Sequence, residues 1–90
     1  MDGEIFRSLL NTDLYCNIEF AASIFIDDNK LRESLSLSEF CSAYSKFREH
    51  GLNYEAETVV DVAVDIFFKG KRFELVSSLF EQNYNFHRRI

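Results

Sequence analysis

The sequence predicts an all-α domain with four to five helices arranged as antiparallel helical hairpins. The 90 residues include no proline and only three glycines, so few residues of the chain would interrupt a long helix. Hydrophobic residues make up 47% of the chain, which suffices for one folded core. Apolar residues also recur at helical spacing in most segments. We therefore expect residues 1–90 to form a single domain.

Two helices are predicted for the first third of the chain. The first spans Asp2–Leu10, with its apolar residues on one side. The second begins after Thr12 or Asp13, because either side chain can accept a hydrogen bond from a free backbone N–H. Its stripe at helical spacing is Leu14, Ile18, Ala21, Ala22 and Phe25. Phe20 and Ile24 add apolar surface outside that stripe.

A capping box predicts the start of the third helix. Ser36 precedes Glu39 by three residues, the spacing at which each side chain bonds the other's backbone N–H. Gly51 is expected to end the helix, since glycine adopts left-handed dihedrals without a Cβ clash. Before it, residues 27–29 suit a loop and residues 31–37 are ambiguous. The apolar face of this helix is Phe40, Ala43, Tyr44 and Phe47.

The fourth helix is predicted to span Tyr54–Lys69, with Asn53 as its cap and Gly70 at its end. Residues 60–66 also alternate with period two and are rich in β-branched side chains, which is typical of a strand. We favour the helix because the run is long and is flanked by helical patterns. A fifth helix is expected from Arg72 to about Gln82, followed by a fraying polar tail at 83–90.

Composition and motifs disfavour several classes of function. The net charge of −5 lacks the basic face of a nucleic-acid binder. Phosphate-binding, dinucleotide-binding and nucleophile-elbow motifs are absent, so we expect a non-enzymatic protein with no catalytic residues and no cofactor. Cys16 and Cys41 stand alone, without zinc-site spacing, and indicate buried thiols of a reducing compartment. No apolar run is long enough to cross a bilayer, so the expected location is cytoplasmic, with no membrane partner.

The fourth helix carries more apolar surface than one packed face requires. On a helical wheel its apolar arc covers about 200°, against about 100° for an ordinary surface helix. The helix either lies between two layers of the protein or presents one side to a partner protein. Both interpretations remain open at this point.

Acidic residues follow the other side of the same helix. Glu57, Asp61 and Asp65 stand at successive i,i+4 steps, where like charges repel. A cationic partner would relieve this repulsion, although a solvated stripe is the alternative interpretation. Phe68 lies within the stripe.

The region from Asn53 to Phe80 resembles a degenerate tetratricopeptide hairpin. The apolar positions that carry the resemblance are Val60, Ala63, Val64 and Phe67 in the first helix and Phe73, Val76 and Phe80 in the second. Lys71 stands where the repeat usually has its turn glycine, and Gly70 comes one position earlier. Residues 54–82 would form the hairpin, and the remaining helices or a partner would complete its core.

A small acidic chain of this kind resembles the YscG-type co-chaperones of type III secretion needle subunits. The resemblance implies a hetero-oligomer with one or more small proteins. It also implies that a hydrophobic groove holds the amphipathic helix of a needle subunit and blocks polymerisation. Under this hypothesis the expected partner-binding residues are Tyr44, Phe47, Val59, Val62, Ile66 and Phe68.

A second hypothesis starts from the charge of the chain. Small acidic helical proteins can act as immunity or antitoxin proteins, which neutralise basic nuclease toxins by matching their charge. The working surface would then be the acidic stripe, Glu55, Glu57, Asp61 and Asp65. Binding to this surface would weaken at high salt.

Overall fold

The computed structural model describes residues 2–79 and 81 and confirms the all-α fold class. Helices are the only regular secondary structure among the described residues, and short turns connect them. They are α1 (Asp2–Leu10), α2 (Tyr15–Asp27), α3 (Asn29–Ser34), α4 (Leu37–Glu49), α5 (Asn53–Lys69) and a further helical segment at residues 73–79. The strand alternative for residues 60–66 is therefore wrong. The predicted helix end near Gln82, its Phe80 and the tail at 83–90 lie outside the described residues.

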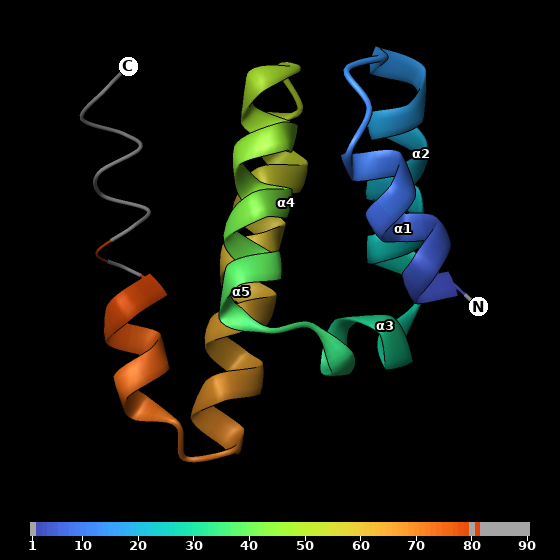
Figure 1. The fold of residues 1–90 in the computed structure, drawn as a ribbon. Coiled ribbons are helices and arrows are strands. Elements are labelled where there is room, and N and C mark those ends of the chain that lie inside the picture. The colour runs from blue at the N-terminus through green and yellow to red at the C-terminus, as the bar shows by residue number, and fades with distance from the viewer. Residues whose placement is uncertain (1, 80, 82–90) are drawn as a thin grey trace.

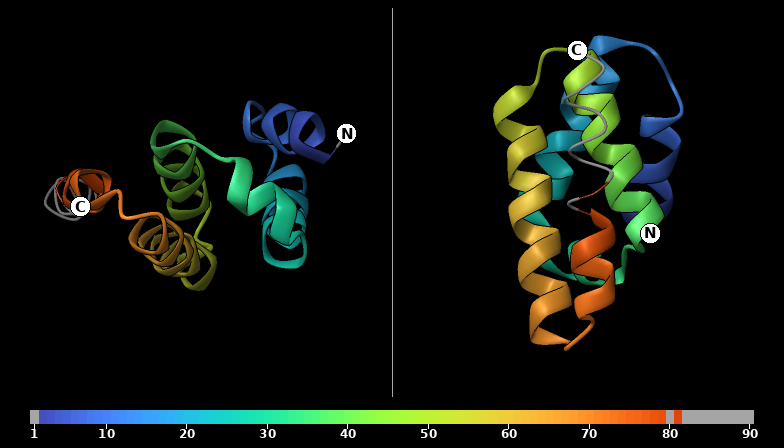
Figure 2. Two further views of the ribbon diagram at one scale, coloured as in Figure 1. Left: turned by 90° about the horizontal axis from the view of Figure 1, so that it is seen from below. Right: turned by 90° about the vertical axis from the view of Figure 1, so that its left-hand side faces the viewer.

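Two antiparallel hairpins dominate the architecture. α1 packs against α2, and α4 packs against α5, while the short α3 crosses between the hairpins at one end (Figure 1). The helical segment at 73–79 lies beside α5, on the side away from α1 and α2 (Figures 1 and 2). The chain thus places the α1–α2 hairpin at one edge of the molecule and the 73–79 segment at the other.

The beginning of α4 follows the predicted capping box. The Ser36 hydroxyl accepts a hydrogen bond from the Glu39 N–H at 3.3 Å, and the Glu39 carboxylate accepts one from the Ser36 N–H at 3.0 Å. Each bond satisfies a backbone donor that the first turn of a helix leaves free.

The predicted cap of α2 is wrong. Leu14 is the N-cap residue, with no side-chain hydrogen bond to the helix. The Thr12 hydroxyl donates instead to the Leu9 carbonyl at 2.8 Å, and the Asp13 carboxylate accepts from the Lys46 ammonium at 2.8 Å. Both side chains are occupied by partners outside α2. Local sequence does not reveal this competition.

The predicted loop at residues 27–29 is reduced to one residue. Asp28 ends α2 and also caps α3, because its carboxylate accepts from the Leu31 N–H at 3.0 Å. The Arg32 guanidinium then donates to the carbonyls of Phe25, at 2.9 Å, and of Ile26, at the end of α2. A cation at this position complements the negative end of the α2 dipole. The ambiguous segment at 31–37 is therefore helical in its first half.

Asn53 is also not a cap. α5 begins directly after Leu52, and Asn53 is its first helical residue. The reason is the preceding turn, in which the Leu52 N–H donates to the Phe47 carbonyl at 2.8 Å and the Gly51 N–H donates to the Arg48 carbonyl at 3.1 Å. This is a Schellman motif, with Gly51 in the left-handed region at φ 79° as predicted.

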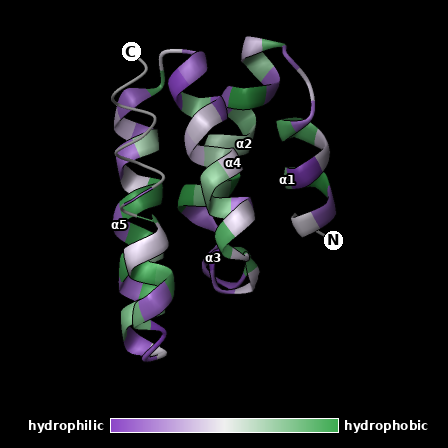
Figure 3. Ribbon diagram, turned by 60° about the vertical axis from the view of Figure 1, so that its left-hand side comes forward, coloured by the Kyte–Doolittle hydropathy of each residue, from purple (hydrophilic) through white to green (hydrophobic). Residues whose placement is uncertain are grey.

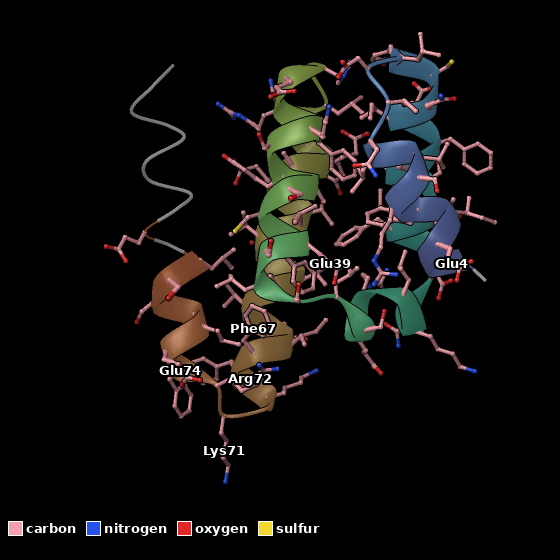
Figure 4. All side chains as sticks on the ribbon, viewed as in Figure 1. Glu4, Glu39, Phe67, Lys71, Arg72 and Glu74 are labelled. Carbon is pink, nitrogen blue, oxygen red and sulfur yellow. The ribbon has the colours of Figure 1, made fainter. Side chains whose placement is uncertain are left out.

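The same motif recurs at the end of α5. The Arg72 N–H donates to the Phe67 carbonyl at 2.8 Å, and the Lys71 N–H donates to the Phe68 carbonyl at 3.0 Å. The left-handed residue is Lys71, at φ 59°, whereas Gly70 is right-handed at φ −82°. Figure 4 shows Lys71 pointing away from the molecule at this turn. The helix therefore ends near Gly70 as predicted, but Gly70 is not the residue that needs the glycine conformation.

Five phenylalanine rings connect the two hairpins. Phe25 of α2 lies 6.1 Å from Phe6, 6.2 Å from Phe40 and 6.5 Å from Phe47, measured between ring centroids. Phe40 in turn meets Phe67 of α5 edge-on at 5.5 Å. All five rings are buried. The core therefore runs without interruption from α1 to α5.

Two ion pairs span the surface between the hairpins. Arg7 of α1 pairs with Glu39 of α4, and Asp13 pairs with Lys46 further along α4. The hydrogen bond from Arg7 lowers the pKa of the Glu39 carboxyl, and the bond from Lys46 lowers the pKa of Asp13. Both pairs are partly exposed, so they add less than the aromatic core does.

Candidate partner-binding surfaces

The structure buries half of the residues expected to contact a partner. Tyr44, Phe47 and Val59 are almost inaccessible, because α4 and α5 pack along each other and α4 also packs against α2. A partner protein cannot reach these side chains in this fold. The wide apolar arc of α5 is thus explained in part by packing within the chain.

Val62 and Ile66 are more accessible. They are half-buried and form part of an open depression of about 330 Å³ between α3 and α5. Its walls are Asn29, Arg32, Glu33, Asp61, Val62, Asp65, Ile66 and Lys69. The depression brings together Val62, Ile66, Asp61 and Asp65, although charged and polar side chains dominate its walls. In Figure 3, the visible side of α5 carries both hydrophobic and hydrophilic residues.

The acidic stripe is less isolated than the sequence indicates. Lys69 continues the same row, and its ammonium lies 3.1 Å from the Asp65 carboxylate. Glu55 is in the first turn of α5, where the helix dipole favours an anion. Asp61 is exposed, and Glu57 is exposed with interactions of its own. The stripe therefore has local compensation, and a cationic partner is not required to explain it.

Phe68 belongs to an exposed aromatic pair. Its side chain is 60% exposed, that of Phe73 is 51% exposed, and the two rings meet edge-on at 5.0 Å across the turn after α5. At the same turn, the Arg72 guanidinium lies 5.8 Å from the centre of the Phe67 ring (Figure 4). Phe68 is thus stabilised by its own chain, although much of its surface still faces solvent.

A groove between α1 and α2, bordered by the start of α3, exposes apolar surface near the predicted loop. Its volume is about 680 Å³, and its apolar residues are Ile5, Phe20 and Ile24. The Phe20 side chain is 58% exposed and that of Ile5 is 49% exposed. The other lining residues are polar or charged: Ser23, Asp27, Asp28, Asn29 and Lys30. We call this feature the α1–α2 groove.

The sequence contains a signal for this groove. α2 buries Ile18, Ala21, Ala22 and Phe25 on one face, yet Phe20 and Ile24 stand four residues apart on another. The criterion applied to α5, apolar surface beyond one packed face, therefore also holds for α2. Ile5 could not be added from sequence, because only the hairpin brings α1 beside that second face.

The two cysteines differ in accessibility. Cys41 is buried, as predicted, and desolvation raises the pKa of its thiol. Cys16 is exposed, so the expectation that it is buried is wrong. It precedes Phe20 by four residues in α2, which places it on the same side of the helix as the groove.

Within residues 2–79 and 81, no group of three His, Cys, Asp or Glu side chains is placed to hold a metal ion. In the same part of the chain, no helix combines the length and apolar character needed to cross a membrane. Comparison of the chain with protein-family models, curated proteins and solved structures finds no match.

Proposed function

We propose that this chain is a non-enzymatic protein-binding module that holds an amphipathic helix of a partner protein in the α1–α2 groove. One observation carries the proposal: Ile5 and Phe20 leave about half of their surfaces in solvent where they line an open groove. Covering the rest of each side chain is worth roughly 1 kcal/mol, about half of the gain from burying a large apolar side chain completely. Clustered exposed apolar residues with a polar border are typical of protein-interaction sites.

The shape of the groove favours a helix as the ligand. Phe20 and Ile24 form a row along α2, and Ile5 faces them from the antiparallel α1. A helix lying between two helices inserts side chains spaced at i, i+3 or i+4, and i+7 into such a groove. The polar border formed by residues 27–30 would meet the hydrophilic edge of that helix.

This mode of binding suits a small chaperone. A secreted or self-assembling partner whose apolar helix face is covered cannot use that face to polymerise. The resemblance to YscG-type co-chaperones suggests the C-terminal helix of a type III secretion needle subunit as the ligand. The working complex is then a hetero-oligomer.

The test compares two phenylalanine substitutions at similarly exposed positions. Phe20→Asp places a charge in the groove, whereas Phe73→Asp makes the same change at the opposite edge of the molecule. The ligand is a synthetic C-terminal helix of the needle subunit from the same genome, and affinity is measured by titration calorimetry. We expect Phe20→Asp to weaken binding by about 30-fold or more, the effect of losing an interface anchor. Phe73→Asp should stay within about twofold.

Two outcomes would overturn different parts of the proposal. If the needle helix does not bind the wild-type protein, the needle-subunit assignment is wrong. In that case, the wild-type protein and the Phe20→Asp variant are each immobilised, and the proteins that each retains from an extract of the native host are compared. If every protein retained by the wild-type chain is retained equally by Phe20→Asp, the groove is not the binding site and the proposed function is wrong. Matching helical circular dichroism spectra establish that both variants fold.

A further inference from the structure

The border of the α1–α2 groove carries an uncompensated acidic group. Asp27 is the last residue of α2, is exposed, and has no ion-pair partner among the described residues. Asp28 is occupied as the cap of α3, through its hydrogen bond with the Leu31 N–H. Lys30 is the one cation among the groove-lining residues. Two carboxylates and one ammonium leave this border with a net negative charge.

The position of Asp27 makes its charge unfavourable within the chain itself. The C-terminal end of a helix carries a partial negative charge, so an anion there is destabilising and a cation is stabilising. The last turn of α2 contains no basic residue. Arg32 reaches the end of α2, but its guanidinium is engaged by the carbonyls of Phe25 and Ile26 and by the Asn29 side chain. Arg32 thus offsets the dipole of α2, and the negative charge left unpaired among the described residues at this end of the groove is that of the exposed Asp27 carboxylate.

We propose that the helix held in the α1–α2 groove is basic along the edge that faces Asp27. Its lysine or arginine lies within one turn of the apolar residues that contact Phe20 and Ile24. This inference rests on the proposed function and specifies the chemistry of the ligand. The net charge of −5 acts in the same direction, because it attracts a cationic helix before contact.

Such a border charge has a recognisable signature. Charged groups at the edge of an interface mainly change the association rate and the salt dependence, while the apolar contacts set most of the affinity. Screening at high salt should therefore remove the preference for a basic helix but leave the contribution of Phe20 intact.

The experiment uses two synthetic amphipathic helices of roughly 18 residues with identical leucine faces. One carries lysines beside the leucine row, and the other carries glutamates at the same positions. A fluorophore on the exposed Cys16 thiol reports binding, because this residue lies one turn from Phe20 and the Cys41 thiol is buried. We expect the lysine peptide to bind the wild-type protein about tenfold more tightly at low salt.

Three protein variants locate the effect. Asp27→Lys should reduce the preference for the lysine peptide by about three- to tenfold, whereas Lys30→Glu should increase it. Glu74→Lys is the matched control, because it changes the net charge by the same amount as Asp27→Lys on the segment at the far edge of the molecule (Figure 4). It should change the preference by less than about twofold.

The outcomes separate this inference from the proposed function. If both peptides bind with equal affinity, or if Glu74→Lys acts as strongly as Asp27→Lys, the basic-edge inference is wrong and the groove still binds a helix. If neither peptide binds the wild-type protein, the proposed function fails together with the inference.

Discussion

Lys71 adopts a backbone conformation that glycine usually takes. Its φ of 59° lies in the left-handed region, where the Cβ of an L-residue crowds the backbone at a cost of about 1 kcal/mol. The Schellman hydrogen bonds around it fix this geometry. The resemblance to a tetratricopeptide hairpin would place a turn glycine at position 71. The neighbouring Gly70 obscures this assignment, because sequence alone cannot determine which of two adjacent residues turns left.

Replacing Lys71 should therefore stabilise the protein. Lys71→Gly removes the Cβ crowding and keeps both backbone hydrogen bonds, so we expect the free energy of unfolding to rise by about 0.5–1 kcal/mol.

Gly51→Ala tests the same argument in reverse. A methyl group added at Gly51 would meet no atom within 4 Å, so the φ of 79° alone should lower the free energy of unfolding by about 1 kcal/mol. Urea titration measures both. An unchanged or lower stability for Lys71→Gly would contradict the strain argument.

At the scale of the elements, the local sequence pattern predicts where the helices lie, but it predicts only some of their capping residues correctly. The Ser36–Glu39 capping box and the Gly51 turn involve residues close in sequence, so the pattern contains the whole interaction. Thr12, Asp13 and Asn53 have the right chemistry for caps, yet they do not serve as such. A distant partner, Lys46, takes Asp13, and the Schellman turn leads directly into α5 before Asn53. Competition of this kind depends on the tertiary fold.

The contact between α1 and α4 gives a pH-dependent prediction. The bond from Arg7 holds the pKa of Glu39 below its ordinary value. The carboxylate therefore stabilises the fold at neutral pH, and this contribution is lost as the pH falls through the folded-state pKa. Glu39→Gln keeps an N3 residue suited to the capping box but loses the charge. We expect the variant to be less stable than the wild type at pH 7 and equally stable at strongly acidic pH, as measured by urea titration across this range. A difference that does not vary with pH would refute the ion-pair contribution.

At the scale of the whole molecule, Phe25 joins the two hairpins. It contacts Phe6 within its own hairpin and both Phe40 and Phe47 of α4. This convergence also explains why the sequence overestimates the accessible apolar surface. Tyr44, Phe47 and Val59 form an available apolar face only until α4 packs against α5 and α2. The exposed remainder, including Phe20, becomes visible only when the packing of every helix is known.

Phe25→Ala should destabilise both hairpins together. Removing a buried phenylalanine ring costs about 3–5 kcal/mol, a large share of the stability of a domain this size. Far-UV circular dichroism follows all helices, and a fluorophore on Cys16 follows the α1–α2 hairpin. We expect one shared unfolding midpoint, shifted equally for both signals, whereas Phe20→Ala on the exposed side of α2 should shift it little. Two separate midpoints in the wild-type protein would show that the hairpins unfold independently.

The interior of the described part of the chain contains no buried polar or charged residue. Its helices are thus held in position chiefly by the steric fit of apolar side chains. Apolar exchanges that conserve total volume should be widely accepted, so the ring cluster can be redesigned freely while the groove outside keeps its chemistry. In such a protein, surface residues can be changed without altering the fold, because the volume of the buried apolar side chains determines how the helices pack.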